Sequence, residues 1–284
     1  MSEKKIQFVP AFTLIEEARR KLGRFKYRIL VISGKGGVGK SVVSSMIAIG
    51  LSTRGRKVSL LDADIHGSSI PLILGLSNTR HYANENGEII PVEGPLGVKV
   101  VAVNLMLDSP DIPVVWRGPL LGRAVIELTS KVAWDYNDYL VVDMPPGTGD
   151  VAITISQIFP KPTSGILVTA PNVLSEIIVS KTVNFAMSTG IKLLGIIENM
   201  SYFKCPHCGE ITHIMGKTGA EKLAEKYGLN LIGKIPLDPE INNLVESGEI
   251  KKIIEDSTLE PYISIQGIID RIISLVEQQD LITR

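Results

Sequence analysis

The residues from Gly34 to Ser41 read Gly-Lys-Gly-Gly-Val-Gly-Lys-Ser and fit the phosphate-binding pattern G-x-x-x-x-G-K-[ST]. The preceding residues 28–33 are rich in apolar, β-branched side chains, which is typical of a buried strand. From Ser41 to about Arg54, apolar side chains recur at helical spacing. This feature therefore predicts a loop that joins a strand to a helix and binds a polyphosphate at the start of that helix.

Each residue type in this loop has a physical role. All four of its glycines are expected to take positive φ, so that backbone N–H groups turn inward and form an anion site. Lys40 is expected to reach the β- and γ-phosphates, and the hydroxyl of Ser41 to coordinate Mg²⁺. The predicted nucleotide contacts here are Gly34, Lys35, Gly36, Gly37, Val38, Gly39, Lys40, Ser41 and Val42.

Lys35 is a second lysine, placed directly after the first glycine of the loop. We expect it to bridge the phosphates of a nucleotide held by a second copy of the chain, as an arginine finger does in trans. The alternative is a solvated surface lysine. Lys35 and Lys40 are thus both candidate catalytic residues.

Composition limits the class of protein. A chain of 284 residues with 44% hydrophobic content can bury one large α/β domain, which we place at residues 27–284 after a polar leader, residues 1–26. Thirty basic residues balance thirty acidic ones, so nucleic acid and anionic membranes are not expected partners. Neither a bilayer-spanning stretch of roughly 18 to 20 residues nor a signal peptide is visible, which predicts a cytoplasmic protein.

Strand-like runs alternate with amphipathic stretches along the chain. This alternation predicts an α/β fold of the P-loop NTPase architecture, with a mostly parallel twisted sheet, helices on both faces and ligands at the carboxyl ends of the strands. Helices are expected near 14–22 and 262–277, and a hairpin-like excursion without assigned chemistry at 78–97. The predicted strands are residues 28–33, 58–62, 98–103, 139–143, 165–169, 193–198 and 231–235.

Two carboxylates stand at the end of the second predicted strand. We expect Asp62 in the water shell of Mg²⁺, and Asp64 to orient or activate the attacking water. The alternative is a turn-capping aspartate, which is common after strands. His66 in the same loop is expected to be exposed rather than catalytic.

Another carboxylate follows the apolar run 140–142. This pattern is typical of a Walker B strand, in which Asp143 holds Mg²⁺ through water. Gly147 is expected to let the next loop approach the γ-phosphate and swing when that group leaves. Asp150 is expected to cap the helix that follows, and contact with a partner is the alternative.

The residues that would recognise the base of the nucleotide are predicted less directly than those of the phosphate loop. The amide of Asn199 offers both a donor and an acceptor for the edge of adenine, and the segment 235–239 could form a second wall. A satisfied loop asparagine and a plain proline turn are the alternatives.

The chain has two cysteines, Cys205 and Cys208, in a C-x-x-C turn. Both thiols can bind one soft metal, but a zinc ion or an iron–sulfur cluster needs four ligands. Three interpretations stay open at this point. His207 or His213 could complete a zinc site, a homodimer could hold a bridging four-iron four-sulfur cluster with two thiols from each subunit, or the pair could be a redox dithiol.

Taken together, these motifs closely resemble those of the Mrp/ApbC iron–sulfur cluster carrier ATPases, which have a deviant Walker A loop and are related to MinD and ParA. The resemblance runs from about residue 25 to about 255. The motifs that carry it are 34–41, 62–67, 116–119 (Trp-Arg-Gly-Pro), 143–150, 199–201, 205–209 and 235–238.

The resemblance implies a homodimer that binds ATP and Mg²⁺, hydrolyses ATP slowly, and passes a labile [4Fe–4S] cluster to apo-proteins. It implies that Cys205 and Cys208 hold the cluster between subunits, and that Asn199, Pro236 and Asp238 form the adenine wall. Where relatives often carry an aromatic residue and a proline, this chain has His66 and Ser68.

Two other functions compete with the carrier. A MinD- or ParA-like dimerisation switch shares the loop, but it has no use for paired thiols, and no basic amphipathic tail follows residue 262. A cytosolic ATPase with a structural zinc knuckle is the second alternative.

Overall fold

The computed structural model describes residues 11–106, 118–135, 138–171, 175–216 and 219–282. Its main sheet has the order β12-β9-β8-β1-β7-β2-β6-β5, and only β5 runs antiparallel to its neighbour. Each of the seven predicted strands is confirmed, with ends that shift by at most a few residues. With β5, which was not predicted, the eight strands of this sheet are β1 (Tyr27–Ile32), β2 (Val58–Asp62), β5 (Val92–Glu93), β6 (Lys99–Ala102), β7 (Tyr139–Asp143), β8 (Thr163–Thr169), β9 (Ile191–Glu198) and β12 (Asn230–Lys234).

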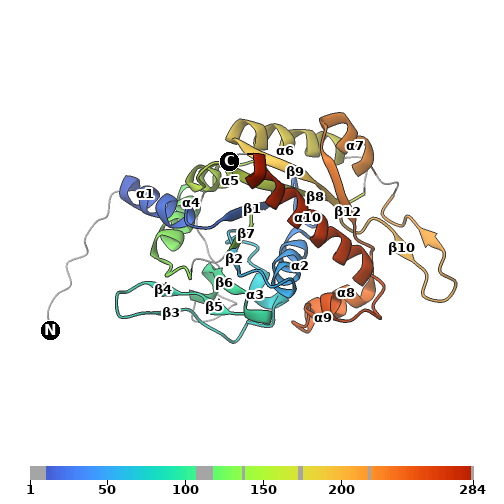
Figure 1. The fold of residues 1–284 in the computed structure, drawn as a ribbon, viewed down its shortest axis with the longest axis horizontal. Helices are drawn as coiled ribbons and strands as arrows, with labels where there is room; N and C mark the ends of the chain where they lie inside the picture. The colour runs from blue at the N-terminus through green and yellow to red at the C-terminus, as the bar shows by residue number, and fades with distance from the viewer. Residues whose placement is uncertain (1–10, 107–117, 136–137, 172–174, 217–218, 283–284) are drawn as a thin grey trace.

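Helices cover both faces of this sheet, as predicted (Figure 1). Side chains alternate along β1, so Ile29 and Val31 enter one core cluster while Leu30 and Ile32 enter the other. The first face carries α2 (Lys40–Thr53), α3 (Ile70–Ile73), α8 (Pro239–Glu246), α9 (Lys252–Glu255) and α10 (Tyr262–Ile282). The second carries α1 (Ala11–Leu22), α4 (Gly118–Lys131), α5 (Asp150–Ile158), α6 (Ser175–Thr189) and α7 (Ala220–Tyr227).

The excursion predicted at 78–97 is confirmed as a hairpin. Strands β3 (Tyr82–Ala83) and β4 (Ile89–Ile90) pair antiparallel. The side chain of Asn84 shapes the turn between them by accepting from the N–H groups of Asn86 and Glu88. Short 3₁₀ segments, η1 (Pro95–Gly97) and η2 (Val103–Met106), flank β6.

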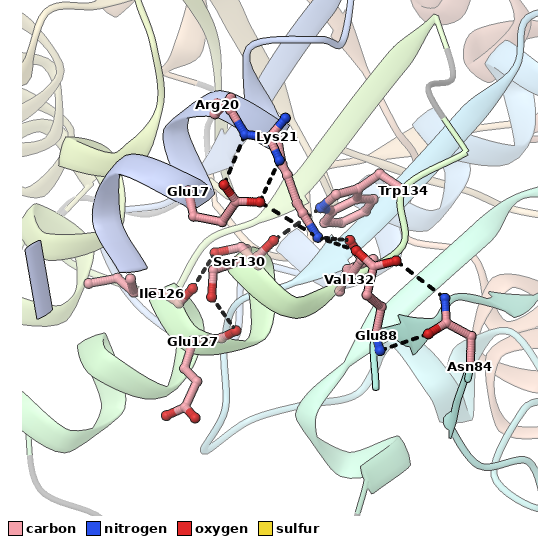
Figure 2. A network of polar contacts seen from close by, with 11 residues as sticks. Glu17, Arg20, Lys21, Asn84, Glu88, Ile126, Glu127, Ser130, Val132 and Trp134 are labelled. Carbon is pink, nitrogen blue, oxygen red and sulfur yellow. Dashed lines mark hydrogen bonds and ion pairs between the residues drawn. The ribbon is translucent and has the colours of Figure 1, made fainter. Parts of the chain in front are cut away.

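The buried side chain of Lys21 ties this hairpin to α1 (Figure 2). Its Nζ donates to Glu88 Oε1 at 2.8 Å and to the Val132 carbonyl at 2.9 Å, just past α4. Leu14, Ala18 and Leu22 of α1 enter the same core cluster as α4 and α5. The described part of the leader therefore packs on the domain, and the boundary at residue 26 stays a prediction.

The helix predicted near 262–277 is confirmed as α10, and it docks on the sheet. Ile268 and Ile269 of α10 enter the first core cluster. A Cβ at Gly233 of β12 would lie 2.3 Å from Ile268 Cγ1, so only glycine lets this helix approach so closely. Among the described helices, none is both long and apolar enough to cross a bilayer.

Candidate functional site

The sheet brings the carboxyl ends of β1, β7 and β2 together. β7 lies between the other two, and Asp62 pairs with Asp143 in the parallel register of β2 and β7. The loops that follow these three strands therefore meet at one edge, where a parallel sheet places its ligands.

The loop from Gly34 to Ser41 differs from the prediction in its backbone. Gly37 and Gly39 take positive φ, at 78° and 75°, but Gly34 and Gly36 do not, so the prediction is wrong for those two. A Cβ at Gly34 would lie 2.2 Å from Ile178 Cγ2 of α6, so Gly34 is required by close packing. Nothing lies within 4 Å of a Cβ at Gly36. Gly39 caps α2 and directs the first N–H groups of that helix toward the loop.

A cavity of about 460 Å³ lies over this loop. It brings the predicted phosphate residues 35–42 together with Asp64 from the second motif and with Val245 from α8, whereas Gly34 and Gly147 are not among its lining residues. A larger hollow of about 1000 Å³ lies between α5 and α6, but no residue of the loop lines it. The lining of the smaller cavity is Ser33, Lys35, Gly36, Gly37, Val38, Gly39, Lys40, Ser41, Val42, Asp64, Gly67, Ser69, Leu72, Ile73, Pro146 and Val245.

Asp143 is the centre of a buried polar cluster beneath the cavity. Its Oδ1 accepts from Lys40 Nζ at 2.7 Å and from Ser44 Oγ at 2.7 Å, and its Oδ2 accepts from Ser41 Oγ at 2.6 Å. Sequence reasoning missed Ser44. Its position four residues after Lys40 on one helix is the signal that places both side chains on the same face.

Asp62 lies beside this cluster and is also buried. Its Oδ2 accepts from Ser68 Oγ at 2.8 Å and from the Ile70 N–H at 3.3 Å, so it holds the loop after β2 as the turn-capping alternative describes. Burial, and then the charge of Asp143, raise the pKa of Asp62 to about 7. The two buried carboxylates, Asp62 and Asp143, have one buried lysine, Lys40, as their counter-charge. The site therefore lacks positive charge, and its carboxylate oxygens suit a divalent cation.

Asp64 is half-buried and faces the cavity. Its Oδ1 accepts from the Gly67 N–H at 3.2 Å. Burial raises the pKa of the Asp64 carboxyl above its ordinary value, which makes it a better proton acceptor for water. His66, exposed as predicted, lies two residues further on.

The loop after Asp143 packs against the end of β1. The Met144 N–H donates to the Val31 carbonyl at 3.1 Å, and the Gly147 N–H donates to the Ser33 carbonyl at 2.8 Å. Gly147 takes a φ of 82°, which allows the chain to turn toward the loop of Gly34. The expected capping by Asp150 is wrong, because Gly149 is the N-cap of α5 and Asp150 lies in its first turn.

The predicted base-binding residues lie next to one another but outside the lining of the cavity. The segment after β9 pairs with the segment after β12, since the Ser201 N–H donates to the Ile235 carbonyl at 2.9 Å. Asn199 Nδ2 donates to the Val38 carbonyl at 3.0 Å, and Asp238 caps α8 by accepting from the Glu240 N–H. Pro236, two residues before Asp238, is buried. Their role toward adenine stays a prediction.

The two cysteines occupy the turn of a short hairpin, β10 (Phe203–Lys204) and β11 (Ile211–Thr212), which projects from the domain (Figure 1). The Gly209 N–H donates to the Cys205 carbonyl at 2.9 Å, and Gly209 takes a φ of 74°. Cys208 is exposed and Cys205 is half-buried. Hydrogen bonds from the backbone of Cys208 and His207 lower the pKa of the Cys205 thiol.

The neighbourhood of the thiols is poor in further ligands. No three His, Cys, Asp or Glu side chains come together as a metal site within the ranges that the structure describes. His213 is exposed, and its Nδ1 lies 3.1 Å from the Ser201 carbonyl. Of the predicted motif 116–119, Trp116 and Arg117 lie outside the described residues.

Comparison with protein families matches residues 24–273 to the family described as NUBPL iron-transfer P-loop NTPase. An iron–sulfur cluster carrier protein from Saccharolobus solfataricus is 42% identical over 263 residues, which cover 92% of this chain and 88% of the relative.

Solved structures show the same architecture. A nucleotide-binding protein from Archaeoglobus fulgidus in complex with ADP is 35% identical, covers 88% of this chain and 95% of its own, and has a TM-score of 0.75. The cell division protein MinD from Aquifex aeolicus has a TM-score of 0.61 over 87% of this chain and 97% of its own. At 22% identity it supports the fold alone.

Proposed function

Because this chain belongs to the NUBPL family of iron-transfer P-loop NTPases, we propose that it is a cytoplasmic, homodimeric carrier that hydrolyses ATP slowly and delivers an iron–sulfur cluster to apo-proteins. Nucleic acid and membrane have no part in this proposal. The single observation that carries it is the turn with Cys205 and Cys208, which presents two thiols at the surface and, within the described residues, no third ligand.

The nucleotide half of the function rests on the cavity over the loop of Gly34. Lys40 and the N–H groups at the start of α2 would neutralise the β- and γ-phosphates. Ser41, Asp143 and Asp62 are the residues that would hold Mg²⁺, which would supply positive charge beside the phosphates. Asp64 would orient the attacking water, as its place in the cavity and raised pKa suit a proton acceptor.

Lys35 lines the same cavity but belongs to the part of the loop that precedes the helix. We propose that it acts on the nucleotide of a second subunit and neutralises charge that develops during hydrolysis. The dimer would thus be needed both for ATP hydrolysis at the phosphate loop and for holding the iron–sulfur cluster at the cysteines.

The cargo half of the function follows from ligand counting. Four thiolates bind a [4Fe–4S] cluster, and each chain has two cysteines in total. A two-fold axis through the Cys205 turn would bring two thiols from each subunit to one cluster. A cluster held at an exposed turn between two subunits is accessible to an acceptor, which suits a carrier.

Anaerobic reconstitution with iron, sulfide and Mg-ATP tests this function. We expect a brown, oxygen-labile protein whose native mass corresponds to one cluster per two chains. Cys205→Ser and Cys208→Ser should each lose the visible absorbance, whereas His207→Ala, changed between the two cysteines, should keep it. Tight binding of one zinc per chain that depends on His207 or His213, without a visible band, would instead favour the zinc knuckle.

A further inference from the structure

The segment Asn199–Ser201 contacts the phosphate loop on one side. Asn199 is almost fully buried, and its Nδ2 donates to the Val38 carbonyl at 3.0 Å, across 161 positions of sequence. The fit is close, because a Cβ on Gly39 would lie only 2.2 Å from that Nδ2. Any movement of the loop around Val38 must therefore be followed by the asparagine side chain or must break its bond.

The same segment contacts the cysteine hairpin on the other side. The carbonyl of Ser201 lies 3.1 Å from His213 Nδ1, and because a carbonyl only accepts, the ring must carry its proton on Nδ1. Ser201 is itself held firmly. Its N–H donates to the Ile235 carbonyl, and its Oγ donates to the buried carboxylate of Glu198 at 2.6 Å.

Met200 connects the two contacts in a conformation that resists rearrangement. Its φ is 54°, in the left-handed region that non-glycine residues rarely adopt. Within the described residues, Met200 and Leu96 are the two non-glycine residues with a positive φ. A strained residue persists only where its surroundings determine its conformation, and Met200 packs against the first core cluster. The Asn199 and Ser201 contacts are thus joined by a short, well-held piece of backbone.

We propose that Asn199–Ser201 transmits nucleotide occupancy from the phosphate loop to the cysteine turn, and that His213 is the positioning residue that completes the connection. The inference rests on the proposed function for the identity of the cargo, but not for the connection itself. Because such coupling is reciprocal, a cargo that moves the turn must change nucleotide affinity by the same factor.

The other contacts of the hairpin offer a matched control. Lys204 of β10 donates to Glu260 Oε2 at 2.9 Å, which ties the hairpin to the start of α10, away from the phosphate loop. This ion pair and the His213 bond both anchor the same exposed hairpin. Of these two side-chain contacts, the His213 bond is the one that ends on the segment 199–201, whose Asn199 donates to Val38.

The test measures the rate at which a thiol-specific reagent modifies the cysteines of the full-length protein, with and without the Mg²⁺ complex of a non-hydrolysable ATP analogue. We expect the analogue to change the wild-type rate by about 2- to 10-fold, since one hydrogen bond limits the coupling to about that factor. In His213→Ala the ratio of the two rates should fall to about one. In His213→Asn, which keeps a donor near the position of Nδ1, most of the ratio should return.

Two further variants separate this role from a merely structural one. Glu260→Ala should keep the wild-type ratio, although it also loosens the hairpin. His213→Phe keeps a ring without the donor and should behave as His213→Ala does. The affinity for the analogue should stay within about twofold in each His213 variant when the thiols carry no cargo, since His213 does not line the cavity.

Two results would overturn the proposal. One is a wild-type thiol rate that does not respond to the analogue, and the other is a His213→Ala ratio equal to that of wild type. Neither bears on cluster reconstitution, so the carrier function would survive both. Failure of reconstitution with an intact response of the thiols would instead remove the carrier function and leave this connection in place.

Discussion

Lys40 Nζ lies 2.7 Å from Asp143 Oδ1, and both side chains are almost completely buried. The pair joins the start of α2 to the end of β7 and so holds the phosphate loop against the Walker B strand. Ser41 and Ser44 also donate to this carboxylate. Removing one partner from such a pair leaves a buried charge without its counter-charge.

Lys40→Ala is therefore expected to affect both binding and stability. Nucleotide binding should be lost, because no other lysine in the loop is placed at the start of α2. The free energy of unfolding should fall by about 2 to 4 kcal/mol, since Asp143 stays buried while two serines still donate to it. Calorimetric titration with ATP and urea denaturation measure the two effects. Unchanged stability would contradict a role of this ion pair in holding the phosphate loop against β7.

Lys35→Ala separates the two lysines of the loop. We expect ATP binding within about threefold of wild type and hydrolysis reduced by about 10³-fold or more, the size of an arginine-finger effect. Mixing this variant with Lys40→Ala provides a sharper test of action in trans. A mixed dimer has one site with Lys40 from one chain and Lys35 from the other, so it should have about half the activity of wild type, and an equal mixture with free subunit exchange about a quarter. No recovery on mixing would mean that Lys35 acts within its own chain.

Gly39→Ala tests the close contact behind the loop. A methyl group there would meet Asn199 Nδ2 at 2.2 Å, and alanine is strained at a φ of 75°. We expect a loss of about 2 to 3 kcal/mol of stability together with nucleotide binding. Gly36→Ala is the matched control, because φ is not positive and nothing lies within 4 Å of the added carbon. Its stability should change by less than about 0.5 kcal/mol. Equal losses in the two variants would contradict this account.

The prediction from sequence succeeded where one local pattern decides the structure. A short apolar run rich in β-branched residues, such as 139–143, favours a buried strand, and β7 begins and ends at those residues. It failed where distant contacts decide. The reason for Gly34 is a side chain of α6, 144 positions away. The error at the start of α5 is local instead, since Gly149 rather than its neighbour Asp150 is the cap. For Asn199 the role toward adenine stays a prediction, and no local signal could show that its amide donates to Val38.

The pH dependence of stability should reveal the protonation of His81, a half-buried histidine of the excursion. His81 Nδ1 donates to the Ile90 carbonyl at 2.9 Å, and its Nε2 accepts from the Ala102 N–H at 3.2 Å, so the ring is neutral in the fold. Burial lowers the pKa of His81 below its ordinary value near 6.5. The unfolded chain therefore binds this proton more readily than the folded chain does. The contribution of His81 to stability is complete above about pH 6.5 and is lost as the pH falls toward the lower pKa of the folded state.

The loss should be about 1 kcal/mol, the worth of one hydrogen bond, because a protonated Nε2 can no longer accept from Ala102. Urea denaturation at pH 7.5, 6 and 5 measures it, and His81→Gln, which does not titrate, should show a correspondingly smaller decline. An equal decline of stability in the two proteins would mean that folding does not change the pKa of His81.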